Sequence, residues 1–246
     1  MSELSPEAGD PAPDEPHLLP RAVPASRAFR WYEDALRLFK QAPGTWIGLA
    51  LIAVATEFLL SPIPVAGEVL SELITPVVAC GLVYAAAVTD RGEAPSLRYA
   101  VAALGIPAGA LIAVIAASVV PSMLQALAAW WLADVNVFGA DTKMTELPTA
   151  TLIGIHAIGI LVSLPFTFVP YHVLLERVVP RAAFVASFSG FAQNALPLLA
   201  YSAVSLVLLG FCILTSGLGL VLALPLWAAS GYAAWKDIFD VRIASG

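Results

Sequence analysis

The chain has 246 residues, of which 59% are hydrophobic and only 12% are charged. Soluble globular domains are about 45–50% apolar and about 25% charged, so this composition excludes a water-soluble enzyme and a disordered protein and indicates a multi-pass membrane protein. The formal net charge of −6 argues against a surface that binds nucleic acid.

Residues 1–25 differ in composition from the rest of the chain. They include six prolines and five acidic residues, with almost no large apolar side chains. Such a segment cannot bury enough surface to offset its ordering entropy, so we expect a disordered cytoplasmic tail in which His17 is solvated. No basic stretch followed by an apolar run marks a cleavable signal peptide. Residues 26–246 are expected to form one transmembrane domain.

The segment from Ser26 to Lys40 has the pattern of an amphipathic helix. Apolar side chains recur at helical spacing, and charged side chains occupy most other positions. Such a helix lies in the membrane interface, and Ser26 is its expected N-cap. The apolar stripe consists of Phe29, Tyr32, Leu36 and Phe39.

Six stretches are long and apolar enough to cross the roughly 30 Å hydrocarbon core, which takes about 20 residues. The expected fold class is therefore all-α, with six transmembrane helices and amphipathic interfacial elbow helices. Pro165 and Pro170 predict kinks within the fourth span. Ser216–Gly217 leaves room only for a tight turn between the last two spans, unless these merge into one re-entrant element. The expected spans are Thr45–Ile63, Glu72–Thr89, Ile106–Leu132, Ala150–Leu175, Leu196–Thr215 and Leu218–Trp235.

Lys and Arg residues are distributed unevenly over the loops between these spans. Six spans place eleven of them on the face that carries the N-terminus and only Lys143 on the other. Because basic loops stay in the cytoplasm, both termini are expected there, with the chain in the inner membrane of a bacterium. Trp130 and Trp131, at the outer end of the third span, are expected in the aromatic belt.

A proline opens a span after a mixed or amphipathic segment at three places, Pro43, Pro107 and Pro197. This pattern suggests three repeats, each an elbow helix followed by a hairpin of spans. The alternative is that proline simply favours the first turn of a helix. The third elbow, residues 181–194, carries an aromatic stripe of Phe184, Phe188 and Phe191.

Three ionisable residues within the spans form a candidate polar site, because charge is costly at membrane depth. Glu57 in the first span and His156 in the fourth are expected at a similar depth in the outer half of the bilayer, where they could relay protons or bind a cation. Glu72, four residues after Glu68, would complete an outward-facing acidic cluster. The structural alternative is a protonated Glu57, a His156 bonded to a carbonyl, and carboxylates that favour a helix N-terminus.

His172 and Glu176 lie one helical turn apart at the inner end of the fourth span. The pair could be half of a metal site, but no second half with matching spacing is present, and we expect a local contact within the pair or with Arg177. Cys80 and Cys212 lie in apolar stretches and are expected to be buried. No metal, cofactor or catalytic residue is predicted, and motifs of hydrolases and nucleotide-binding proteins are absent.

Three stretches combine aromatic, small and polar residues in a recognisable order: Trp31–Trp46, Phe184–Pro197 and Leu224–Phe239. They resemble an uncharacterised family of six-span inner-membrane proteins of Gram-negative bacteria, a domain of unknown function. That family is loosely similar to the membrane domain of some glycerophosphodiester phosphodiesterases. The resemblance implies topology but no activity, because the soluble catalytic domain has no counterpart here.

The function expected first is a non-enzymatic scaffold, assembly partner or envelope-maintenance factor. The spans contain few polar residues and the elbow helices are amphipathic. Both features suit contacts with lipid, with a membrane-protein partner or with a second copy of the chain. The alternative is a small-solute or ion transporter that uses Glu57, Glu72 and His156. A third class is an intramembrane enzyme or a haem-binding subunit that uses His156 and His172. A transporter requires a polar cavity that reaches mid-membrane, whereas a scaffold should have a dry interior.

Overall fold

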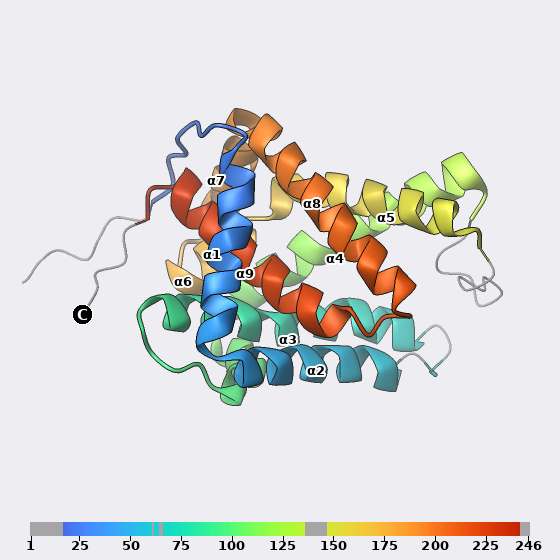
Figure 1. Cartoon of the computed structure of the whole chain (residues 1–246), viewed down its shortest axis with the longest axis horizontal. Coiled ribbons are helices and arrows are strands. Elements are labelled where there is room, and N and C mark those ends of the chain that lie inside the picture. The colour runs from blue at the N-terminus through green and yellow to red at the C-terminus, as the bar shows by residue number, and fades with distance from the viewer. Residues whose placement is uncertain (1–16, 61, 64–65, 136–146, 242–246) are drawn as a thin grey trace, which may run out of the picture.

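The computed structural model of the chain describes residues 17–60, 62–63, 66–135 and 147–241. All regular structure in these ranges is helical, and the helices form an elongated bundle (Figure 1). The helices are α1 (Arg27–Gln41), α2 (Pro43–Leu60), α3 (Ala66–Asp90), η1 (Leu97–Gly105), α4 (Ala108–Ala133), α5 (Thr149–Ser163), η3 (Leu164–Phe166), α6 (Val169–Leu175), α7 (Pro180–Gln193), α8 (Ala195–Leu214) and α9 (Leu220–Ile238).

Five helical segments of the described chain are long and apolar enough to cross a membrane. They overlap the first five expected spans, with ends that differ by a few residues except in the fourth, which ends at Phe166 rather than at Leu175. The described residues therefore confirm the all-helical class, and the five apolar helices suggest association with a membrane. The five segments are Pro43–Leu60, Val69–Asp90, Ala108–Leu132, Thr149–Phe166 and Ala195–Leu214.

The expected fourth span is not one continuous helix. It divides into α5, the short 3₁₀ helix η3 and α6. Pro165 and Pro170 each lie in the first turn of one of the later helices, where a missing N–H breaks no intrahelical hydrogen bond. The prediction of a single kinked helix over Ala150–Leu175 is therefore wrong, and the prolines begin new helices instead.

The helix α9 matches the expected sixth span, but it is not among the five apolar segments. Its last turn carries Lys236 and Asp237, and its C-terminal half is almost entirely buried against other helices. A helix covered by protein can carry polar and small residues that a lipid-facing helix cannot. The turn before it, through Ser216 and Gly217, is as tight as expected, and both residues have positive φ angles of 52° and 89°.

The helix α1 packs on α9, and the apolar stripe expected at the membrane interface is divided between the surface and the core. Its buried residues are Ala28, Trp31, Ala35 and Leu38, whereas Phe29 and Leu36 are exposed. Ser26 precedes the helix but makes no capping hydrogen bond through its side chain. Phe29 and Leu36 thus remain on the surface, where an interfacial helix needs apolar side chains, whereas Tyr32 and Phe39 pack against the core. The small residues Ala28 and Ala35 let α1 approach α9 closely.

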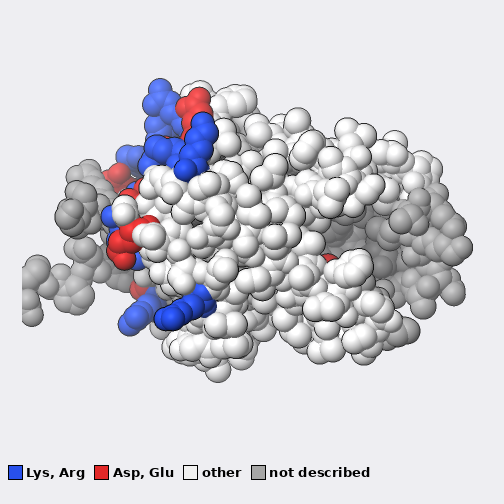
Figure 2. All heavy atoms as spheres, turned by 60° about the horizontal axis from the view of Figure 1, so that its bottom comes forward, with Lys and Arg blue, Asp and Glu red and all other residues white. Residues whose placement is uncertain are grey.

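The short helix η1 lies directly on α3. A Cβ atom added at Gly81 would lie 2.8 Å from the backbone carbonyl carbon of Tyr99, so only glycine permits this approach. On the face shown in Figure 2, the Lys, Arg, Asp and Glu side chains gather at one end of the molecule. We call this the charged end. Lys143, Asp141, Glu146 and Arg242 lie outside the described residues.

Candidate functional site

Glu57 and Glu72 lie on the neighbouring helices α2 and α3. The Glu57 carboxylate accepts hydrogen bonds from the hydroxyls of Ser71 and Thr75 on α3, the second at 3.1 Å. Glu72 forms a hydrogen bond with Ser122 on α4 and interacts electrostatically with Glu57. The structure therefore brings these two predicted residues into one polar tract across three helices. The Glu68 side chain lies outside the described part of the chain.

His156 on α5 is anchored within its own helix. Its Nδ1 lies 2.8 Å from the carbonyl oxygen of Leu152, one turn earlier. This is the contact with a carbonyl that the structural alternative expected. Among the described residues, no hydrogen bond or ion pair joins His156 directly to Glu57 or Glu72. The structure thus assembles the two carboxyl groups and leaves the imidazole apart from them.

A cavity of about 510 Å³ lies beside His156, between α4, α5, α8 and α9. Its polar lining comes mainly from Ser118, Ser122 and Gln125 on α4 and from His156, while most of the remaining lining is apolar. Ser122 also bonds to Glu72, so a single hydroxyl connects the cavity to the acidic tract. His156 and Glu72 therefore belong to one continuous polar region without touching each other.

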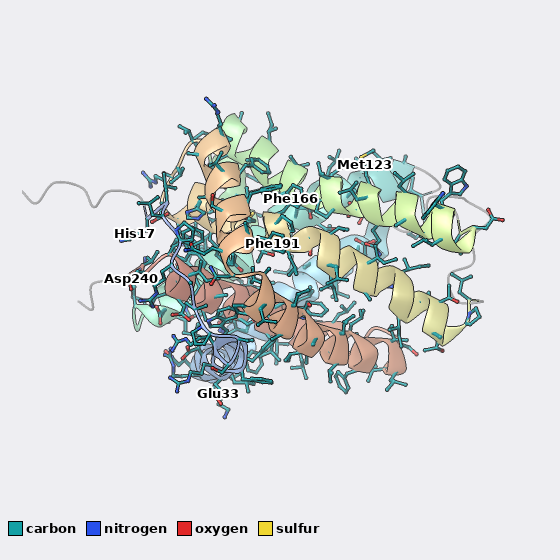
Figure 3. The ribbon with its side chains drawn as sticks, turned by 90° about the horizontal axis from the view of Figure 1, so that it is seen from above. His17, Glu33, Met123, Phe166, Phe191 and Asp240 are labelled. Atoms are coloured by element: carbon teal, nitrogen blue, oxygen red, sulfur yellow. The ribbon has the colours of Figure 1, made fainter. Side chains whose placement is uncertain are left out.

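A second cavity of about 300 Å³ adjoins the first toward the charged end, between α3, α4, η3, α6 and α9. Ser118, Ser163 and Trp227 line both cavities. The second cavity is lined mainly by apolar side chains, among them Val83 and Phe166. Figure 3 shows Phe166 inside the bundle, whereas Met123 of α4 points away from it. Together the two cavities change from polar to apolar along the bundle.

The position of Gln125 depends on a glycine in the facing helix. A Cβ atom added at Gly159 of α5 would lie 2.3 Å from Oε1 of Gln125. Gly154, one turn and a half earlier on the same helix, has no atom within 4 Å of the corresponding position. Gly159 therefore makes room for the Gln125 amide in the wall of the larger cavity.

His172 and Glu176 meet at the charged end, as the sequence predicted. Nδ1 of His172 lies 2.8 Å from Oε2 of Glu176. The other carboxylate oxygen, Oε1, accepts a hydrogen bond from the backbone N–H of His17 and lies 2.9 Å from Nδ1 of His17. Burial by itself would raise the pKa of Glu176, but the contacts with His172 and His17 outweigh it and hold the pKa below its ordinary value. His172 is fully buried, and the three side chains are not arranged to share a metal ion.

The contact with His17 corrects the expectation of a solvated tail. Residues 17–24, which we call the strap, have no regular structure but bond to α9 and to the residues that directly follow α6 and α7. The Arg21 N–H donates to the carbonyl of Ile238, and the Val23 N–H donates to Oδ1 of Asn194. The Asn194 amide in turn donates to the Arg21 carbonyl. Residues 1–16 lie outside the described residues.

Asp237 connects the strap, α1 and α9 at the charged end. Its nearly buried carboxylate accepts hydrogen bonds from Arg21 Nη2 at 2.9 Å, Arg27 Nε at 2.6 Å and Trp31 Nε1 at 2.9 Å. Burial alone would raise the pKa of Asp237, but these donors outweigh it and hold the pKa below its ordinary value. Figure 3 shows His17 and Asp240 at this same end of the molecule, and Asp240 pairs with Arg21 at 3.1 Å.

Asp90, at the end of α3, holds a second network at the charged end. It pairs with Lys236, accepts a hydrogen bond from the Tyr232 hydroxyl at 3.1 Å and lies 3.8 Å from Arg37. A cavity of about 230 Å³ opens between the Asp90 and Asp237 networks. Basic and acidic groups alternate around it, so it has no excess of either charge to attract an ion.

Sequence reasoning did not single out Gln125, Asp90 or Asp237. Gln125 was hidden because one amide in a long apolar span carries no motif. The two aspartates had a usable signal, since each stands in the last turn of an apolar helix. Asp237 in addition follows Trp235 and Lys236 directly. An acid at that position opposes the helix dipole, which predicts a specific partner.

No protein-family model matches the chain, and no curated protein and no solved structure matches it.

Proposed function

We propose that this protein is a six-span protein of the bacterial inner membrane that binds a small molecule within the bilayer. The observation that carries the proposal is the larger cavity, where Ser118, Gln125 and His156 face a space among otherwise apolar helices. Its volume of about 510 Å³ falls in the range of about 300–1,000 Å³ that small-molecule sites occupy. We rank the scaffold role second, because that role does not require a cavity of this size with polar side chains in its wall.

The six-span topology is supported by the course of α9. This helix starts after the tight turn at the end away from the charges and returns to the charged end, where Asp237 meets α1 (Figure 1). With α9 as the sixth crossing, both termini lie at the charged end. Because basic residues favour the cytoplasmic side, we assign this end to the cytoplasm.

The three proposed repeats are supported by the order of the elements. A shorter helix precedes an apolar helix three times: α1 before α2, η1 before α4, and α7 before α8. The first of these helices keeps Phe29 exposed and the third keeps Phe188 exposed, which suits helices at a lipid interface. We regard the lipid bilayer as the principal partner of these elbows.

Retention of a bound molecule tests the proposed function. The protein would be released from membranes in a native-lipid polymer, and its small molecules would be extracted and compared by mass spectrometry. Ser118→Phe places a large side chain in the wall of both cavities. We therefore expect the amount of any molecule extracted with this variant to be at least tenfold lower than with the wild-type protein. Val207→Phe adds a similar bulk to an exposed position of α8 and is the matched control.

The proposal fails if Ser118→Phe and Val207→Phe retain the same molecules in the same amounts. Both variants would first be compared with the wild-type protein by size-exclusion chromatography and thermal unfolding. If Ser118→Phe did not fold, Gly159→Ala, which displaces the Gln125 amide, and its control Gly154→Ala would replace the pair.

A further inference from the structure

The charge of the cavity wall limits what the cavity can hold. Among the described residues that line the two cavities there is no Lys, Arg, Asp or Glu. The carboxyl group of Glu72 lies behind Ser122, which bonds to it. Burying an ion without a partner of opposite charge costs several kcal/mol. A phosphate, carboxylate or ammonium group would find no counter-charge here, so the ligand's polar group is neutral.

The polar part of the cavity lies at a definite depth. Gln125 stands eight residues before the end of α4, and His156 stands seven residues after the start of α5. At 1.5 Å per residue, both lie about 10–12 Å from the helix ends remote from the charged end. From there the lining becomes apolar toward the charged end, past Trp227 to Val83. An amphiphile fits this gradient with its head near Gln125 and its chain pointing toward the charged end.

The hydrogen-bonding groups of the wall suit a head that both donates and accepts. Because the Leu152 carbonyl can only accept, Nδ1 of His156 carries a proton, and Nε2 is then the acceptor of the uncharged form of an imidazole. Gln125 offers both an amide donor and a carbonyl acceptor. The Ser163 hydroxyl is already used, since it donates to the Ile160 carbonyl at 2.8 Å. A hydroxyl and an ester carbonyl would match the groups that are left.

We infer that the cavity binds an uncharged single-chain lipid of the monoacylglycerol type. Its glycerol ester head lies between Gln125 and His156, and its acyl chain passes Trp227 into the second cavity. The inference rests on the proposed function and adds the chemical class of the ligand. The orientation is that of a lipid in the leaflet away from the charged end.

Photolabelling with matched lipids tests the class. The full chain would be placed in phosphatidylcholine nanodiscs with a monoacylglycerol that carries a diazirine in its acyl chain. Probes with the same chain but a phosphate or a choline head would be used at the same mole fraction. We expect the neutral probe to label peptides of α4, α5 and α9 that line the cavities at least tenfold more than either charged probe.

A pair of variants tests the head position. Gln125→Leu removes the amide at similar volume, and we expect it to lower labelling by the neutral probe at least threefold. Gln193→Leu makes the same change at an exposed position of α7 near the charged end and should leave labelling unchanged. Equal labelling of the two variants would overturn the proposed head position, and thermal unfolding would establish that both are folded.

The outcomes separate this inference from the proposed function. If a charged probe labels the cavity as well as the neutral one, the neutral class is wrong, while binding in the cavity stands. The class is also wrong if no probe labels the cavity but the protein retains an extracted molecule that Ser118→Phe loses. If neither labelling nor retention is observed, both the class and the proposed function are wrong.

Discussion

Replacing Asp237 by Asn should release the strap at the charged end. The nearly buried carboxylate accepts three hydrogen bonds, two of them from arginines. Asn keeps the shape but has only one oxygen, and its NH₂ group must then face Arg21 or the donors Arg27 and Trp31. The variant therefore leaves at least one donor unsatisfied and removes the negative charge that both arginines face.

The size of the effect follows from these contacts. A hydrogen bond to a charged group contributes about 1.5–3 kcal/mol, and breaking a buried charge pair costs about 3–5 kcal/mol. Only Arg21 joins the strap to Asp237, since Arg27 and Trp31 belong to α1, and Arg21 is half-exposed, which screens its share of the interaction. We therefore expect strap opening to become easier by about 1–2 kcal/mol. Since 1.4 kcal/mol corresponds to a factor of ten, the opening equilibrium of the strap should rise by roughly 5- to 30-fold.

Hydrogen exchange at two strap amides measures this opening. The Arg21 N–H donates to the Ile238 carbonyl, and the Val23 N–H donates to Asn194, so both amides are protected only while the strap is bound. Asp34→Asn is the matched control, because Asp34 forms an exposed pair with Arg37 at 3.2 Å that should contribute less than about 1 kcal/mol. If Asp237→Asn speeds exchange at these amides no more than Asp34→Asn does, the reasoning is refuted.

Two further predictions concern packing and pH. Gly81→Ala should lower the free energy of unfolding by about 1–3 kcal/mol, because its Cβ would meet the rigid backbone of Tyr99. Gly44→Ala is the control and should leave the free energy of unfolding unchanged, because a Cβ atom at Gly44 has no atom within 4 Å. Equal thermal midpoints of the two variants in nanodiscs would contradict the prediction. The pKa values of Glu176 and Asp237 are lowered in the folded protein from their ordinary values of 4.5 and 3.8. Each carboxylate therefore contributes its full stabilisation above its ordinary pKa and loses it as the pH falls through the lower pKa of the folded state. Strap exchange, corrected for its intrinsic rate, should therefore stay constant from pH 7 to about pH 5 and rise below about pH 4; a rise that begins near pH 6 would count against this assignment.

The composition and hydropathy of this chain were enough to predict its helical class. Apolar runs of about 20 residues are stable only as helices in a bilayer, because a backbone in lipid must satisfy its own hydrogen bonds. The same signal located four of the five apolar segments to within a few residues and the start of the fourth, and the spacing of His172 and Glu176 was enough to predict their contact. These features are local, so a pattern along the chain reveals them.

Tertiary structure decided what those patterns left open. Whether Glu57 meets Glu72 or His156 depends on which helices are neighbours, and hydropathy is the same for every arrangement of apolar helices. The buried face of α1 and the position of Gln125 were set by small residues, Ala28, Ala35 and Gly159, which permit close approach but carry little hydrophobic signal. The strap became ordered because partners more than 150 residues away, Glu176 and Asp237, satisfy its polar groups.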